Sequence, residues 1–231
     1  MSAALSRDGR SQGSDARSVA PDRRAFGFAF AASCVAGPLG LLTPRVARAG
    51  AQVEEPLADS VRSVLSAAVA DSAPPRPAFE TMDARLAYLR WLGEMSTRLR
   101  RREAEHLRRV EFLETAWYES KRAGLEPSLL LGLIQVESGF RRWVVSSAGA
   151  RGYTQVMPFW ARLIGDGDAS RLFHMQTNLR FGCVILRHYI NVERGDLYMA
   201  LGRYNGSRGR PEYPNAVLAA RQSWDYKAPA A

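Results

Sequence analysis

Apolar residues recur every three or four positions along most of this chain, the spacing of an α-helix with one buried face. Short stretches rich in glycine, proline, serine or aspartate separate the periodic segments. No segment shows the apolar–polar alternation of a half-buried β-strand. The pattern predicts helices over 53–70, from 81 into the arginine-rich run 98–102, and over 104–122, 126–138, 157–164, 178–194, 197–204 and 212–223. The predicted fold class is therefore all-α.

The two helices before residue 122 each have an apolar stripe that we expect to be buried. The stripe of the first consists of Leu86, Leu89, Trp91, Leu92, Met95 and Leu99, and that of the second of Leu107, Val110, Leu113, Ala116 and Trp117. The arginines at 98 and 100–102 are expected to face water. A role for them as a polymer-binding strip stays open.

The helix over 126–138 is apolar almost all round, so it is predicted to be fully buried. Pro127 favours its first turn, and Gly139 follows its end. Glu137 lies in the last turn, where both burial and the helix dipole favour the neutral acid over the carboxylate. Two interpretations follow from the residues alone. Either Glu137 pairs with Arg141 or Arg142, or it is an acid with a raised pKa at a functional site.

The first 49 residues are typical of an export signal. Arg23 and Arg24 precede an apolar stretch over 25–42. The small residues Ala47 and Ala49, separated by one residue, then form the pattern of a signal-peptidase cleavage site. The paired arginines are typical of a twin-arginine signal. The apolar stretch is short for a bilayer span of roughly 20 residues. We therefore predict a cleaved signal and a periplasmic protein, with a retained membrane anchor or lipid attachment at Cys34 as the alternatives.

The chain carries a formal net charge of +9, and all but two of its 32 basic residues are arginine. Loss of residues 1–49 would remove a net +4 and leave +5. Because the arginines are spread out and no nucleic-acid-binding motif accompanies them, we do not expect a nucleic-acid partner. After cleavage Cys183 would be the only cysteine, and its apolar neighbours predict a buried, inert thiol. The three histidines are scattered, so no metal or cofactor is predicted.

Four short motifs after Glu137 carry a resemblance. They are Glu137-Ser138-x-Phe140; Ser146-x-x-Gly149-Ala150-x-Gly152-x-x-Gln155-x-Met157-Pro158; Asn178-x-x-x-Gly182; and Ala200-Leu201-x-x-Tyr204-Asn205. In this order and spacing they resemble the lytic transglycosylase (SLT) domain, which has a lysozyme-like fold of the goose type. The resemblance covers roughly residues 105–222.

The residue patterns and the resemblance together give a domain plan. The patterns predict an export signal over 1–49, a helical arm with a proline-rich linker over 50–80 and a helical extension over 81–104, and the resemblance implies a transglycosylase domain over 105–224, followed by a tail over 225–231. The resemblance also implies a reaction, non-hydrolytic cleavage of the MurNAc-β-1,4-GlcNAc bond of peptidoglycan to give 1,6-anhydro-MurNAc ends. Peptidoglycan glycan strands would be the partner, cell-envelope complexes stay open, and the chain is expected to be a monomer.

The family's site residues carry over position by position. Glu137 matches the catalytic acid, which later acts as the base. Ser146 matches a residue that positions the N-acetyl group, and Gln155 and Met157 match residues of the sugar groove. Tyr204 and Asn205 match the Tyr-Asn pair, and Tyr204 is expected to bond the catalytic carboxyl.

A single carboxylate would suffice if the substrate's N-acetyl group acts as the nucleophile. The other nearby carboxylates, Glu119, Glu126, Asp166 and Asp168, are expected at the surface or in caps. Two alternatives to a transglycosylase stay open, namely a peptidoglycan-binding scaffold with little activity and a muramidase that uses water.

The chain also departs from the family pattern. It has Thr154 where the family usually has methionine, and Gly206-Ser207 where the family has Ala-Gly. A glutamate that many members carry four residues before the tyrosine of the last helix is Gly209 here. These departures place the sugar contacts, and so the substrate preference, in doubt.

Overall fold

The computed structural model describes residues 52–70 and 77–227, and within them the fold is built from helices. The elements are α1 (Asp59–Ala70), α2 (Met82–Leu99), α3 (His106–Arg122), α4 (Pro127–Glu137), α5 (Pro158–Ile164), the 3₁₀ turn η1 (Ala169–Phe173), α6 (Met175–Val192), α7 (Leu197–Asn205) and α8 (Glu212–Gln222). In these residues only isolated β-bridges occur, joining Val145 to Arg151 and Arg151 to Val156. The all-α prediction is confirmed. The predicted export signal lies outside the described residues.

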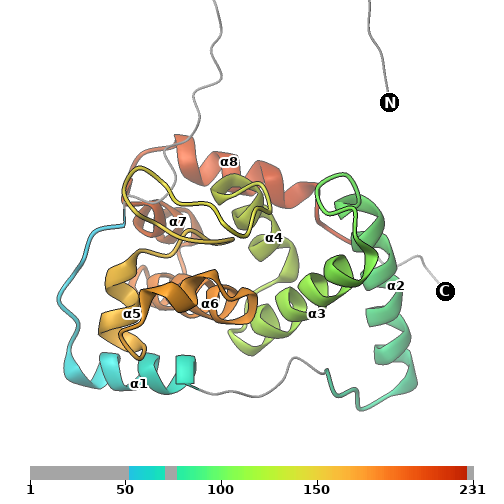
Figure 1. The fold of residues 1–231 in the computed structure, drawn as a ribbon, viewed down its shortest axis with the longest axis horizontal. Helices are drawn as coiled ribbons and strands as arrows, with labels where there is room; N and C mark the ends of the chain where they lie inside the picture. Colours follow the sequence, from blue (N-terminus) through green and yellow to red (C-terminus); the bar gives the residue numbers. More distant parts are fainter. Residues whose placement is uncertain (1–51, 71–76, 228–231) are drawn as a thin grey trace, which may run out of the picture. The chain divides into compact units, whose positions relative to one another are not determined.

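Helix α4 is the core element, as its all-round apolar sequence predicted. All but three of its residues are buried, and it packs against α3 and α8 (Figure 1). Gly132 allows α8 to approach closely, because a Cβ there would lie 2.7 Å from the backbone nitrogen of Arg221 in α8. A backbone contact this tight sets the position of α8 relative to α4.

The segment before residue 70 is attached to the helical core. Residues 52–58 are not helical, so the prediction that the helix starts at 53 was wrong; Pro56, which restricts the residue before it away from the helical region, interrupts it. The indole of Trp160 donates to Gln52 Oε1 over 2.9 Å, and Arg203 pairs with Glu55 at 2.7 Å. Helix α1 then packs against α5 and α6, below them in Figure 1.

Helices α2 and α3 bury less of their apolar stripes than predicted. Leu86, Leu89 and Leu107 are exposed, with Leu107 at 76%, and α3 begins at His106 rather than at 104. Arg109 is buried instead, because its guanidinium donates to Ser96 Oγ at 2.8 Å and to two backbone carbonyls. Periodicity marks a possible buried face, but only the neighbouring elements decide how much of that face is covered.

Glu119 was expected at the surface and is instead 1% exposed, so that expectation was wrong. The side chain of Arg180 in α6 makes an ion pair with it at 2.9 Å, and Arg122 approaches it at 3.4 Å. A carboxylate becomes compatible with burial when a guanidinium supplies both an opposite charge and hydrogen bonds. This pair links α3 to α6.

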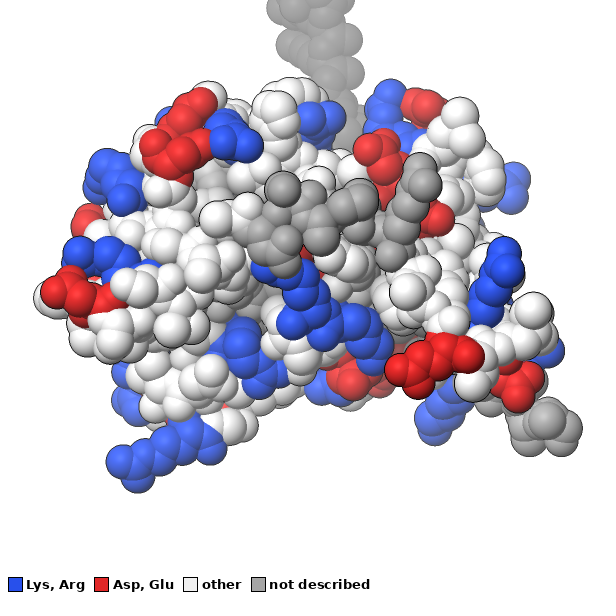
Figure 2. Space-filling model, turned by 90° about the horizontal axis from the view of Figure 1, so that it is seen from below, with Lys and Arg blue, Asp and Glu red and all other residues white. Residues whose placement is uncertain are grey.

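The surface carries both signs of charge. On the face seen in Figure 2, basic and acidic side chains are interspersed, with no large area of a single sign. The arginines at 100–102 are exposed, as predicted. Among the residues that the structure describes, no helix has both the length and the apolar character to cross a bilayer.

Candidate active site

Glu137 is the last residue of α4 and is only 4% exposed. The hydroxyl of Tyr213, in the first turn of α8, donates to Glu137 Oε1 over 2.5 Å. The other oxygen, Oε2, is buried and has no hydrogen-bond partner among the described residues. Burial raises the pKa of the carboxyl to about 8, although the Tyr213 hydrogen bond acts in the opposite direction. The side chain is therefore mostly a neutral acid at pH 7.

The alternative in which Glu137 pairs with a nearby arginine is wrong. Arg141 Nε donates to the carbonyl of Ser138 at 2.9 Å, and Arg142 Nε donates to the carbonyl of Phe173 at 2.8 Å. Neither guanidinium forms an ion pair with Glu137 in the part of the chain that the structure describes. Of the two interpretations of the sequence, the acid with a raised pKa is the one that the geometry supports.

The backbone turns sharply after Glu137. Gly139 and Phe140 both adopt left-handed conformations, with φ of 59° and 67°. Such a φ is unusual for a bulky residue such as Phe140. Its ring is held by contacts with Phe112 and Trp224, at centroid distances of 5.8 Å and 5.1 Å. This turn starts the long loop that passes in front of α4 in Figure 1.

Gln155 and Ser146 shape that loop. Gln155 Nε2 donates to the carbonyls of Val144 (3.2 Å) and Gly152 (2.9 Å), which joins two passes of the loop. Ser146 Oγ accepts the backbone N–H of Ala150 at 3.1 Å. Gln155 Oε1 is buried and has no partner among the described residues. Both side chains therefore form hydrogen bonds to the backbone of the loop and stabilise its conformation.

Tyr204 is fully buried, and its hydroxyl donates to the carbonyl of Thr154 at 2.8 Å. The expected hydrogen bond between Tyr204 and Glu137 is wrong, since Tyr213 holds that position. Tyr204 nevertheless lies close enough for the Glu137 charge to contribute to the rise in its pKa, after the larger effect of burial. Asn205 Nδ2 donates to Ser207 Oγ at 3.1 Å. Met157 is half-buried and immediately precedes α5.

The motif residues of α6 support the loop from behind. Asn178 Oδ1 accepts the backbone N–H of Thr154 at 2.8 Å, and Asn178 Nδ2 donates to the carbonyls of Arg151 and Leu172. A Cβ at Gly182 would lie 2.6 Å from Thr154 Oγ1, so this position has no room for a larger side chain. Asn178 is thus inside α6 and not at its start, which lies three residues earlier than predicted.

Cys183 is buried, as predicted, and burial raises the pKa of its thiol. Within the described residues, no group of three or more histidine, cysteine, aspartate or glutamate side chains could hold a metal ion.

The sequence did not point to Tyr213 as a partner of Glu137. In the family pattern Tyr213 is only the tyrosine of the last helix from which the position of the missing glutamate, Gly209, is counted. The signal that could have found it is its place at the head of the apolar stripe Tyr213, Val217 and Ala220, which α8 turns toward a buried neighbour. That neighbour is α4, whose last residue is Glu137.

Comparison with known proteins finds one family similar to the segment that carries this site. The family model of the transglycosylase SLT domain matches residues 114–223. Membrane-bound lytic murein transglycosylase C of Actinobacillus pleuropneumoniae (serotype 5b, strain L20) is 33% identical over 103 residues, which cover 42% of this chain and 25% of that protein. A transglycosylase of Enterobacteria phage PRD1 is 30% identical over 117 residues, covering 47% of this chain and 42% of the phage protein.

A solved structure of an inactive mutant of the lytic transglycosylase Slt from Pseudomonas aeruginosa also matches. The match covers 61% of this chain and 27% of the Pseudomonas chain, with 22% identity and a TM-score of 0.39. The chain thus spans only about a quarter of the Actinobacillus relative and less than half of the phage protein. Glu137, the loop that follows it, α6 and α7 all fall within the segment that the family model matches, as does Tyr213. Residues 114–223 of this chain are thus similar to the transglycosylase SLT domain.

Proposed function

We propose that this protein is a lytic murein transglycosylase, which cleaves the MurNAc-β-1,4-GlcNAc bond of peptidoglycan without water and leaves 1,6-anhydro-MurNAc ends. The observation that carries the proposal is the Glu137 carboxyl, buried at the end of α4 inside the SLT segment, with a pKa of about 8. A general acid needs a proton to give at the working pH, and burial provides this. Relatives that carry the same segment are named as lytic murein transglycosylases.

The first step would be proton transfer from Glu137 to the glycosidic oxygen. Tyr213 donates to Oε1, so the proton resides on Oε2, the oxygen without a protein partner. As the bond between C1 and this oxygen breaks, the N-acetyl carbonyl oxygen of the MurNAc residue attacks C1. The GlcNAc hydroxyl leaves with the proton, and Glu137 becomes a carboxylate.

The second step would return the proton. The Glu137 carboxylate takes the proton of the MurNAc C6 hydroxyl, and O6 attacks C1 and displaces the N-acetyl oxygen. The products are the 1,6-anhydro ring and the regenerated acid, so no water is consumed. Because the N-acetyl group serves as the nucleophile, a second carboxylate is not needed. The electrostatic surroundings of Glu137 are consistent with this, since burial and Tyr213 are what set its pKa.

The remaining site residues would act mainly by shaping the groove. Gln155 and Ser146 stabilise the loop that follows Glu137 by hydrogen bonds to its backbone. Tyr204 stabilises the same loop by donating its hydroxyl to the carbonyl of Thr154. Met157, which is half-exposed, is proposed to contact sugar. Asn205 has a buried side-chain oxygen without a partner among the described residues, which suits acceptance of a substrate N–H or O–H group.

The proposed location is the periplasm, reached through the export signal over 1–49, with the chain acting as a monomer. The name of the Actinobacillus relative places that protein on a membrane, which is compatible with a cell-envelope role.

The test is digestion of purified sacculi, followed by mass spectrometry of the soluble products. The wild-type protein should release muropeptides that are lighter than the reducing-end forms by one water. The Glu137→Gln protein, checked for folding by circular dichroism, should release none. Products with reducing ends would identify a muramidase, and binding to sacculi without release would identify a scaffold.

A further inference from the structure

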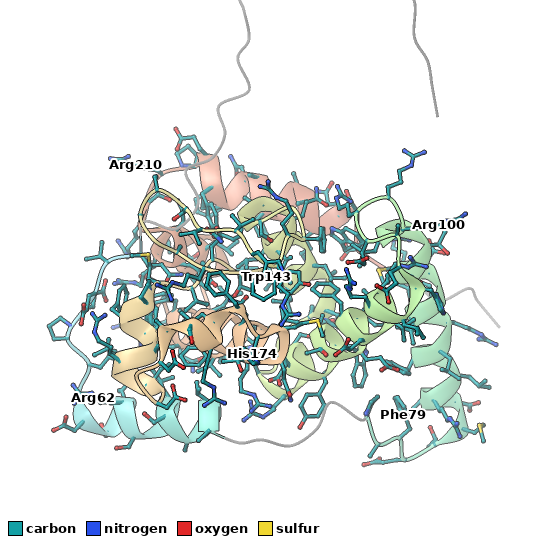
Figure 3. The ribbon with its side chains drawn as sticks, viewed as in Figure 1. Arg62, Phe79, Arg100, Trp143, His174 and Arg210 are labelled. Carbon is teal, nitrogen blue, oxygen red and sulfur yellow. The ribbon has the colours of Figure 1, made fainter. Side chains whose placement is uncertain are left out.

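A pocket of about 620 Å³ is lined in part by the loop that follows Glu137. One wall comes from the connection between α2 and α3, with Arg102, and from the first turn of α3, with Arg108. The other wall comes from the loop after α4, with Arg141 to Val144. The first wall lies outside residues 114–223, so the pocket is formed partly by the extension of this chain and not by the SLT segment alone. Figure 3 labels Trp143 on that loop, near the centre of the view, and Arg100 at the turn after α2, on the right.

The pocket is lined by four arginines and one glutamate. Arg108 is already paired, with Glu105 at 2.6 Å and with the lining residue Glu103 at 3.8 Å. Arg102, Arg141 and Arg142 have no carboxylate partner in the described parts of the chain. Several guanidinium groups that lack a carboxylate partner and line one pocket can bind an anion, because each offers parallel N–H donors to a carboxylate.

These three guanidinium groups are also held in place. Arg102 lies 5.4 Å from the ring centre of Phe140, and Arg142 lies 4.6 Å from that of Trp143. Arg141 and Arg142 each use Nε to bond a backbone carbonyl, which leaves their terminal nitrogens free as donors. Positioned donors lose less conformational entropy on binding than mobile ones do.

The loop that forms one wall of the pocket is also tied to the candidate active site. Arg141 follows Glu137 by four residues and is bonded to the carbonyl of Ser138 at the end of α4. The carbonyl of Val144, in the same wall, accepts the Gln155 amide. In peptidoglycan the sugars are uncharged, because the lactyl carboxyl of MurNAc is amide-linked to a stem peptide, and the anionic groups are carboxylates of that peptide. A stem of four residues reaches roughly 13 Å from the sugar.

From this geometry we propose that the pocket, defined by Arg102, Arg141, Arg142 and Trp143, binds carboxylates of the peptide stem of peptidoglycan. The proposal deepens the proposed function and rests on it. The three arginines supply the charge, and Trp143, which is 68% exposed, supplies an apolar face for the aliphatic part of the stem. The protein then selects glycan strands whose stems are present over bare strands.

The test is a binding measurement that does not need catalysis. The Glu137→Gln protein is titrated with a soluble GlcNAc–MurNAc tetrapeptide, and with the same compound after amidation of its carboxylates. We expect amidation to weaken binding about 5- to 30-fold, as expected for one or two charge-assisted contacts at a partly exposed site. Addition of Arg102→Gln and Arg141→Gln should weaken binding of the free-acid ligand more than that of the amidated ligand, and so reduce the difference between the two ligands.

The matched control is Arg85→Gln with Arg90→Gln, which removes the same charge from exposed positions on α2 and should keep the difference. Equal binding of both ligands to the parent protein, equal weakening of both by the pocket variant, or no binding of either ligand would overturn the proposal. If the double pocket variant fails to fold, Arg141→Gln alone should reduce the discrimination by a smaller factor, and no reduction would count against it. The products released from sacculi by wild-type protein report the proposed function separately.

Discussion

The substitution Glu137→Gln should stabilise this protein at neutral pH, by an amount that grows as the pH rises. The carboxyl has a pKa raised from 4.5 to about 8, mainly by burial. Above pH 4.5 the unfolded chain releases this proton, whereas the folded protein keeps it until about pH 8. The unfolded state thus binds fewer protons in this window, so the contribution of Glu137 to the free energy of unfolding falls with rising pH.

The magnitude follows from the size of the shift. Each unit of pKa difference corresponds to roughly 1.4 kcal/mol, so the destabilisation by Glu137 should grow by about 2 to 3 kcal/mol between pH 5 and pH 7. Glutamine cannot titrate, and its amide oxygen can still accept the Tyr213 hydroxyl. The difference in stability between variant and wild type isolates this one group, because the other titrating groups cancel.

The assay is urea unfolding of both proteins at pH 5, 6 and 7, with free energies from linear extrapolation. Glu126→Gln removes the same charge from an exposed position at the other end of α4 and serves as the control. The variant should gain on wild type by about 1 kcal/mol or more per pH unit in this range. A difference that stays constant from pH 5 to pH 7 would refute the conclusion that Glu137 is a neutral acid at pH 7.

Three further substitutions test other parts of the account. Tyr213→Phe removes a hydrogen bond that lowers the pKa of Glu137, so the alkaline limb of the pH–activity profile should move to higher pH; a shift to lower pH would contradict this. Gly132→Ala should cost about 2 to 4 kcal/mol in urea unfolding, because its Cβ meets the α8 backbone, whereas Gly93→Ala in open space should be neutral or stabilising; equal effects would refute the close α4–α8 contact. Glu119→Gln leaves a buried arginine unpaired and should cost about 3 to 5 kcal/mol; a cost below 1 kcal/mol would exclude a buried ion pair.

Much of the fold could be predicted from local pattern. The burial of α4 follows from its all-round apolar sequence, and the ends of α4 and α5 follow from proline and glycine signals. The errors arose where a neighbour decides the outcome. Leu107 has helical spacing but is 76% exposed, and Pro56 lies within the stretch predicted as the first helix.

The candidate site divides in the same way. Glu137 could be singled out because its neighbours on the same helix are apolar. Its hydrogen-bond partner could not, because Tyr213 is 76 residues away in sequence. Glu119 was misplaced for the same reason, since Arg180 is 61 residues further along the chain. Local sequence shows that a buried acid needs a partner or a raised pKa, but only the packing of helices shows which of these it has.

The contacts of Asn178 and Gly182 in α6 explain why these residue types stand at their positions in the motif. Asn178 and Gly182 match the family pattern, yet their contacts are with the loop that follows Glu137 rather than with open space. Thr154, which departs from the pattern, bonds the side chain of Asn178 through both its backbone and its hydroxyl. The departure is thus accommodated within the described structure by a hydrogen bond between the loop and α6.

In the proposed reaction Glu137 transfers its proton and no water is consumed. The most direct measurement is digestion of sacculi in water enriched in oxygen-18, followed by mass spectrometry of the released muropeptides. We expect 1,6-anhydro products without the heavy isotope, and no product from the Glu137→Gln protein. Reducing-end products that carry one heavy oxygen would contradict it and would show that water attacks the anomeric carbon.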